Sequence, residues 1–213
     1  MLFGIKNDID FVIEYLGKKE NFQLINLSDK NGFTENTAEM NAQNSVLTEL
    51  KKICSDFSIK IEKSSLQNVE LPAEKDFKES ENIICEYNQL VEKIKLSDDK
   101  FASEQKNDDE LVQVLSERNT FKETYQNRIV ELIKSFSLLS QIKNVEKSLE
   151  TTEMTYRITG WVSKNDVKTL SDELIELTDN KIAIREFSTA EVPLALCSDD
   201  SIPVKFNHGK VVK

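Results

Sequence analysis

The sequence of 213 residues is poor in glycine, proline and histidine, with five, three and one of these residues. The glycines lie too far apart to form the phosphate-binding loop of a nucleotide-binding motif. His208 is the single histidine, which disfavours metal sites with two imidazoles and serine or cysteine catalytic dyads. A dyad of His208 with Cys197 is an alternative, but a solvated histidine is the simpler interpretation. These absences argue against an enzyme.

Paired cysteines and long apolar runs are also missing. Cys54, Cys85 and Cys197 are odd in number and far apart, which fits a reducing compartment better than a disulfide framework. The start of the chain lacks the pattern of a signal peptide, and no segment approaches the roughly 20 apolar residues needed to span a bilayer. We therefore expect a cytoplasmic protein.

The formal net charge of −10 disfavours binding to nucleic acid or to an anionic membrane. No basic patch offsets it, although the last residues, with Lys205, Lys210 and Lys213, lean basic. We expect neither a nucleic-acid partner nor a small-molecule substrate.

Acidic pairs raise the possibility of a metal or paired-carboxylate site. They are Asp98-Asp99, Asp108-Asp109 and Asp199-Asp200. Adjacent carboxylates point apart in a helix or strand, so capping and solvation explain them better. We predict no catalytic, cofactor-binding or metal-binding residues and no cofactor. Trp161, after Gly160, is either an exposed contact residue or a core aromatic, and the core is favoured.

Charged residues make up 31% of the chain, which together with scarce glycine and proline is typical of solvated helices. Near the start, residues 2–27 predict a strand, a helix and a strand. Asn7-Asp8 can cap the helix, whose apolar residues recur at helical spacing. These residues are Ile9, Val12, Ile13 and Leu16.

The same order of elements recurs near the other end. Thr155–Val162 alternates as a strand, a helical pattern follows, and Ile182–Phe187 predicts a further strand. An offset of 158 residues pairs Lys6-Asn7-Asp8-Ile9 with Lys164-Asn165-Asp166-Val167, either by chance or as an internal repeat. We predict an α+β fold in which the two chain ends, 1–30 and 154–190, form one four-stranded, ferredoxin-like split βαβ lobe. The strand with Gly160 and Trp161 should share a sheet with a strand of residues 2–27.

Two heptad patterns lie between the chain ends. The first runs through Met40, Leu47, Leu50, Cys54, Phe57 and Ile61. The second runs through Leu111, Phe121, Tyr125, Ile129, Leu132, Phe136, Leu139, Ile142 and Leu149, and Arg118 and Arg128 interrupt it. Thr34 is a candidate N-cap of the first helix. We predict a long antiparallel, coiled-coil hairpin formed by 34–61 and 109–150.

Residues 62–108 would then form a small distal tip. It contains Pro72 and one further predicted helix over about 76–97, which Ser97-Asp98-Asp99 should end. Residues 191–213 follow the second βαβ unit and are predicted to be a linker.

Two segments resemble a known family. They are Thr159-Gly160-Trp161-Val162-Ser163 and Val192-Pro193 followed by Ile202-Pro203-Val204-Lys205-Phe206-Asn207. With the order of elements, they resemble the N-terminal cytoplasmic domain of the V-type rotary ATPase stator subunit, called I in bacteria and archaea and a in eukaryotes. The resemblance covers most of the chain. The family's tip usually carries a second α/β lobe, and 62–108 is short for one.

The resemblance implies a non-catalytic stator arm of a proton- or sodium-translocating ATPase. It implies binding to the peripheral-stalk subunits E and G, resistance to rotor torque, and a position on the cytoplasmic side of a membrane. The linker 191–213 would lead to the protein's own membrane domain, which is absent from this sequence. The family's proton-path arginine lies in that domain, so no ion-translocating residue is transferred to this chain.

Two alternatives remain open. The chain could be a cytosolic adaptor in which a ferredoxin-like lobe displays a coiled coil to protein partners. It could also be a small-ligand regulatory domain, which needs a pocket with converging polar groups. An interface between the βαβ units filled by Phe3, Leu16, Trp161 and Leu174 would argue against the second alternative.

Overall fold

The structure is a computed structural model that describes residues 1–25, 37–61, 68–102, 108–187 and three short strands within 201–211. The chain forms two compact units. The first, which we call the sheet unit, comprises Met1–Thr37, Ser64–Asn68 and Leu138–Lys213. The second, which we call the helical unit, comprises Ala38–Lys63 and Val69–Ser137. No helix within the described residues is long and apolar enough to cross a membrane.

Nine short strands are described, most of them in two small antiparallel sheets. The first sheet has the order β3-β4-β1-β6, the second has the order β5-β2-β7, and β8 pairs with β9. The strands are β1 (Leu2–Ile5), β2 (Phe22–Ile25), β3 (Glu150–Thr151), β4 (Thr155–Ile158), β5 (Gly160–Val162), β6 (Ile182–Ile184), β7 (Ser201–Pro203), β8 (Phe206–Asn207) and β9 (Lys210–Val211). Strand β7 lies within the predicted linker 191–213 and pairs with β2.

Strand β5 shares a sheet with β2, because Trp161 lies opposite Gln23. The expected pairing of the strand that holds Gly160 and Trp161 with a strand of residues 2–27 is therefore confirmed. The expected single strand over 155–162 is instead broken at Thr159, so β4 pairs with β1 and β5 pairs with β2. A Cβ atom at Gly160 would lie 2.3 Å from the Phe22 ring, so this close approach requires glycine. The structure thus divides the expected four-stranded sheet between two sheets.

Helices α1 and α5 of the sheet unit follow the predicted repeat closely. Helix α1 spans Ile9–Lys19 and helix α5 spans Val167–Leu177, so both ends of α5 lie 158 residues after those of α1. The hydroxyl of Tyr15 donates a hydrogen bond to the Glu173 carboxylate, and the same offset separates these two residues. Equivalent positions of the two helices therefore meet.

The capping role predicted for Asn7-Asp8 is not observed. The 3-10 helix η1 (Lys6–Asp8) precedes α1 directly, and Asp8 occupies the N-cap position without a side-chain capping hydrogen bond. The equivalent Asp166 also makes no such bond. Both have helical backbone angles, which differ from the extended conformation of a typical capping residue.

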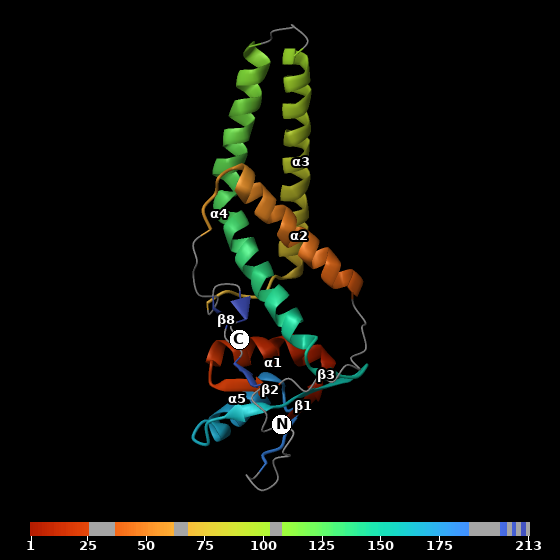
Figure 1. Ribbon diagram of the computed structural model, residues 1–213, viewed down its shortest axis with the longest axis vertical. Coiled ribbons are helices and arrows are strands. Elements are labelled where there is room, and N and C mark those ends of the chain that lie inside the picture. The colour runs from red at the N-terminus through yellow and green to blue at the C-terminus, as the bar shows by residue number, and fades with distance from the viewer. Residues whose placement is uncertain are drawn as a thin grey trace. The chain divides into compact units, whose positions relative to one another are not determined.

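The helical unit contains most of three helices, α2 (Thr37–Asp56), α3 (Glu74–Ala102) and α4 (Asp108–Glu146). All three contribute to one buried apolar cluster, in which Leu50, Ile53 and Ile129 are fully buried. Helices α3 and α4 lie side by side (Figure 1). Three contacts show that the two helices are antiparallel, because residue numbers fall along α3 as they rise along α4. These contacts are Lys93 with Glu117, Glu86 with Tyr125, and Glu79 with Arg128.

The prediction of a two-helix hairpin of 34–61 with 109–150 therefore left out a third helix, α3, which packs with the other two. Residues 74–102 do not form a distal tip but run along α4, and the helix continues through Asp98-Asp99 instead of ending there. The reason lies in the width of the apolar stripe on α4, because residues such as Ile129 and Leu132 need cover from two helices. Ile83, Tyr87 and Leu90 of α3 supply part of that cover. The predicted N-cap Thr34 lies outside the described residues.

Leu132 and Leu115 allow a matched test of this packing. Leu132 is 1% exposed and Leu115 is 49% exposed on the same helix. We expect Leu132→Asp to lower the free energy of unfolding by several kcal/mol, because it buries a charge without a partner. Leu115→Asp should change it by less than about 1 kcal/mol. Urea unfolding followed by circular dichroism measures both values, and equal effects would contradict the described core.

Candidate functional site

Cysteine, histidine and paired acidic residues are the candidates for reactive chemistry in this chain. The described residues contain no group of His, Cys, Asp and Glu side chains that could hold a metal ion. Cys54 is buried, which raises the pKa of its thiol, whereas Cys85 is exposed. Cys197, Asp199-Asp200 and the side chain of His208 lie outside the described residues, as do the side chains of Asp98-Asp99 and Asp108-Asp109. Asp108 is the first residue of α4, which fits the helix-start position expected for that pair.

Arg128 is the main polar contact between α3 and α4. Its Nη2 atom donates hydrogen bonds to Asp76 Oδ1 at 2.6 Å and to Glu79 Oε2 at 2.7 Å. Its Nη1 atom also donates to Glu131 at 3.1 Å, on the same helix. The sequence pattern presented Arg128 only as an interruption of an apolar stripe. The signal that was missed is the acidic start of α3, which Arg128 meets once the two helices are antiparallel.

The Arg128 contacts shift the pKa values of their acidic partners. Burial alone would raise the pKa of the Asp76 carboxyl, but hydrogen bonds from the Ala73 N–H and from Arg128 bring it below the usual value. The hydrogen bond from Arg128 is the largest effect on Glu79 and lowers its pKa as well. Both carboxylates therefore favour the charged state in the folded protein.

Aromatic side chains join all three helices near the end of α2. Phe57 stacks on Phe121 with 5.3 Å between ring centroids, and it meets Tyr87 edge-on at 6.2 Å. The Tyr87 hydroxyl donates to the Asp56 carboxylate, and burial followed by this bond raises its pKa to about 12. The Arg118 guanidinium lies 5.3 Å from the centre of the Phe57 ring and donates to the Asp56 carbonyl. Interlocked rings of this kind favour one fixed helix arrangement.

The C-terminal part of α4 belongs to the sheet unit and is held there by Lys143. The Lys143 Nζ atom lies 2.8 Å from Asp10 Oδ2 on α1 and 3.0 Å from Glu146 Oε2. Burial opposes the charged amine, but the hydrogen bond that Lys143 donates to Asp10 and the other contacts raise the pKa of Lys143 above its usual value. Leu138 and Ile142 are fully buried on the same part of α4. The helix end is therefore fixed to α1 by both apolar and charged contacts.

Several large apolar side chains are exposed. In the sheet unit they are Phe3, Ile5, Phe11, Met154, Trp161 and Leu177, and in the helical unit they are Ile61, Leu96, Val112 and Leu115. Trp161 is 41% exposed, so the expectation that it is a core residue is wrong. Its neighbour Gly160 occupies the side of β5 that contacts Phe22, and the alternation of a strand turns Trp161 to the opposite side. Exposed apolar groups are candidates for contact with other proteins.

The sheet unit also contains a cavity of about 510 Å³ with a mostly apolar lining. Residues of β5 lie on one part of its wall, residues 184–187 on another, and Leu170 and Leu174 of α5 also line it. Of the four residues expected to fill the interface, Leu16 and Leu174 are buried, whereas Phe3 and Trp161 are exposed. A cavity is therefore present, but its lining is mostly apolar, whereas the small-ligand alternative requires converging polar groups.

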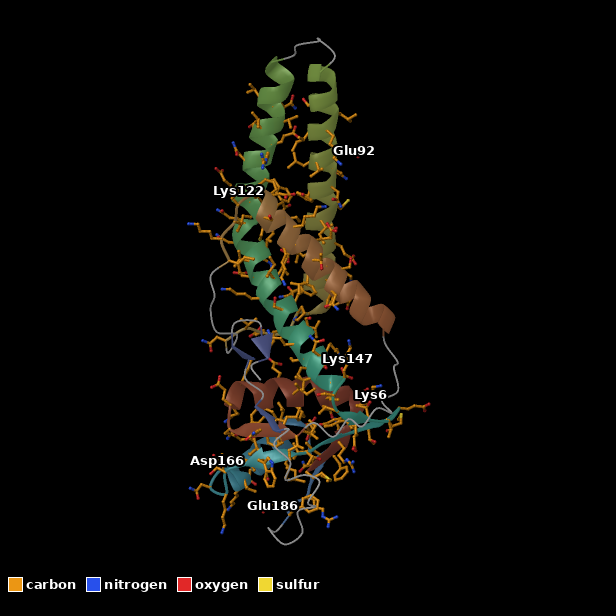
Figure 2. The ribbon with its side chains drawn as sticks, viewed as in Figure 1. Lys6, Glu92, Lys122, Lys147, Asp166 and Glu186 are labelled. Atoms are coloured by element: carbon orange, nitrogen blue, oxygen red, sulfur yellow. The ribbon has the colours of Figure 1, made fainter. Side chains whose placement is uncertain are left out.

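Charged side chains cover the outward surface of the helical unit. Glu92 and Lys122 project away from α3 and α4 in Figure 2. Lys93 forms an ion pair with Glu117 between these helices, with a separation of 2.8 Å. Exposed pairs of this kind contribute little to stability but keep a long helix solvated.

Comparison with known proteins gives one informative similarity. No protein-family model matches the sequence. The chain is 24% identical over 220 residues to "V-type ATP synthase subunit I 2" of Treponema pallidum (strain Nichols). The alignment covers 100% of this chain and 47% of that protein, so the chain spans about half the length of its relative. The similarity suggests a rotary ATPase subunit.

Replacing Arg128 by Met should change the pH dependence of stability. A carboxyl group with a lowered pKa in the folded state stabilises the protein above its unfolded pKa, near 4. This contribution is lost as the pH falls through the folded value. We expect Arg128→Met to lower stability at pH 7 and to make the loss of stability below about pH 4 less steep.

Urea unfolding at several pH values tests this expectation. The matched control is Lys134→Met, which removes a positive charge from the same helix without touching the two carboxylates. A parallel downward shift of the whole pH profile in Arg128→Met would contradict the assignment to Asp76 and Glu79.

Proposed function

We propose that this chain is the cytoplasmic stator arm of a V-type rotary ATPase, corresponding to the N-terminal cytoplasmic domain of subunit I. The observation that carries the proposal is the similarity of the whole chain to a V-type ATP synthase subunit I. On its own the chain is a non-catalytic part of the complex. Whether the complex moves protons or sodium ions depends on parts outside this sequence.

The topology of the sheet unit supports a ferredoxin-like lobe. Strand β1 lies between β6 and β4, and the chain continues from β4 into β5, which pairs with β2. The strands of the two βαβ units therefore interleave, with all pairs antiparallel, as in a split βαβ arrangement. The helical unit is inserted between β2 and β3, in agreement with a lobe that carries a coiled-coil arm.

A stator arm must resist bending and twisting. Helix α4 has 39 residues, which corresponds to about 58 Å of continuous helix. Its middle is covered by α2 and α3, and its end is fixed to α1 through Lys143. The same helix contributes residues to both compact units.

The proposed partners are the peripheral-stalk subunits E and G and the protein's own membrane domain. The exposed apolar groups of both units provide candidate contact surfaces for the stalk. We propose that the arm lies on the cytoplasmic side of the membrane and is anchored through residues 191–213. The half of the relative that lies outside the alignment is consistent with a further domain of that kind.

Co-purification tests the proposal. The chain should bind a purified heterodimer of subunits E and G from the same organism in size-exclusion chromatography. Leu96 and Leu115, which are exposed on α3 and α4, are suitable for charge substitution. We expect Leu96→Glu or Leu115→Glu to weaken binding if the arm contacts the stalk there, while Phe11→Glu tests α1 in the same way.

A pull-down from a lysate of the source organism distinguishes the adaptor alternative. Recovery of proteins unrelated to the ATPase, together with no binding to E and G, would contradict the stator proposal. The translated sequence downstream of Lys213 gives an independent test, because a stator subunit should continue into apolar segments of about 20 residues.

A further inference from the structure

The cavity in the sheet unit lies beside an edge of β5 that pairs with no other described strand. Strand β1 pairs with β4 and β6 at once, because Leu2 lies opposite both Ile158 and Ile184. The Arg185 N–H donates a hydrogen bond to the Met1 carbonyl oxygen at 2.8 Å, which extends this pairing by one residue. Strand β4 is followed by β5, and β6 is followed by residues 185–187. Strand β1 does not extend between β5 and residues 186–187. Among the residues that the structure describes, the register of the sheet thus leaves one strand position open.

The lining of the cavity matches this open position. It includes Gly160, Trp161 and Val162 on one side and Arg185, Glu186 and Phe187 on the other. Strand β5 is an edge strand of its own sheet, with β2 on one side. A strand has backbone donors and acceptors along both edges, so the second edge of β5 can accept a further strand. The cavity therefore has the form of a slot for one extended segment.

Thr159 is a second sign of a missing segment. Its side chain lines the cavity and is 6% exposed, and its Oγ1 atom has no hydrogen-bond partner among the described residues. A buried hydroxyl without a partner is unfavourable, and buried polar groups in native proteins are nearly always satisfied. An extended backbone in the slot would bring carbonyl and N–H groups close to this hydroxyl.

The side chains around the slot indicate what the segment carries. Leu170 and Leu174 form an apolar part of the lining, and strand alternation would direct every second residue of an inserted segment toward one face. Lys164 and Arg185 also line the cavity, and neither forms an ion pair within the described residues. Glu186 is the single acidic residue of the lining. Apolar residues that alternate with acidic residues complement this surface. Glu186 projects from the sheet unit in Figure 2.

We propose that the slot binds an extended, acidic segment of a partner protein, which adds a strand antiparallel to β5. Backbone hydrogen bonds provide affinity, and alternate side chains provide specificity, as in other cases of strand addition. This inference does not depend on the stator assignment, because it follows from the strand register and the cavity alone.

A synthetic peptide tests the proposal directly. The probe is a fluorescein-labelled peptide of about seven residues that alternates Val or Ile with Glu. Trp161 is the single tryptophan and lines the slot, so its emission reports binding without a label. We expect saturable binding by anisotropy and a shift of the Trp161 emission. Absence of both changes up to about millimolar peptide would overturn the proposal.

Backbone methylation separates strand addition from simple groove binding. A strand with neighbours on both sides uses the N–H groups of its odd and even residues on opposite edges. We therefore expect N-methylation of either set to abolish binding. Unchanged binding of both methylated peptides would show that side chains alone are recognised and would overturn the proposed strand.

Charge reversal tests the preference for acidic segments. Lys164→Glu with Arg185→Glu should weaken peptide binding by at least about tenfold. The matched control is Lys168→Glu with Lys181→Glu, which makes the same charge change at exposed residues outside the cavity. Circular dichroism verifies that both variants fold. Equal affinity of the two variants would overturn the charge assignment.

An engineered extension tests the position of the slot. About four alternating apolar and acidic residues added before Met1 should continue β1 into the slot and compete with the peptide. A Gly-Ser extension of the same length is the control and should not compete. Sedimentation equilibrium completes the experiment, because a dimer that shields Trp161 would identify a second copy of this chain as the occupant and overturn the partner assignment.

Discussion

The arrangement of the helical unit depends on the width of the apolar stripe along α4. A narrow seam would be covered by one neighbouring helix, but Ile129, Leu132 and Phe136 are all buried and need cover from two directions. This requirement brings both α2 and α3 onto α4. Arg128 and the aromatic cluster around Phe57 then fix the positions of the helices along one another.

The sheet unit depends on a different constraint, which is its internal symmetry. Helices α1 and α5 begin and end at equivalent positions, and Tyr15 meets Glu173 across the two copies. Neither βαβ unit is large enough to bury its own sheet. Each βαβ unit therefore covers apolar surface of the other, and elements that are distant in sequence pack together.

Sequence patterns predicted the parts of the fold that depend on local periodicity. The apolar spacing of Val12 and Leu16 located α1, and the offset of 158 residues located its counterpart α5. The partner of α4 was not predictable, because three amphipathic helices offer several possible pairings. The break at Thr159 and the exposure of Trp161 depend on contact with Phe22, which is far away in the sequence. The cavity depends on the register between three strands and has no local signature.

The chain leaves the sheet unit after β2 and returns to it through α4 and β3. The strand register that holds the sheet unit together therefore involves no residue of the helical unit. Insertions or deletions of whole helical turns in α3 and in the facing part of α4 would change the length of the helical unit and leave the strand register of the sheet unit unchanged. The helical unit can therefore change in length during evolution without a change in the strand pairing of the sheet unit.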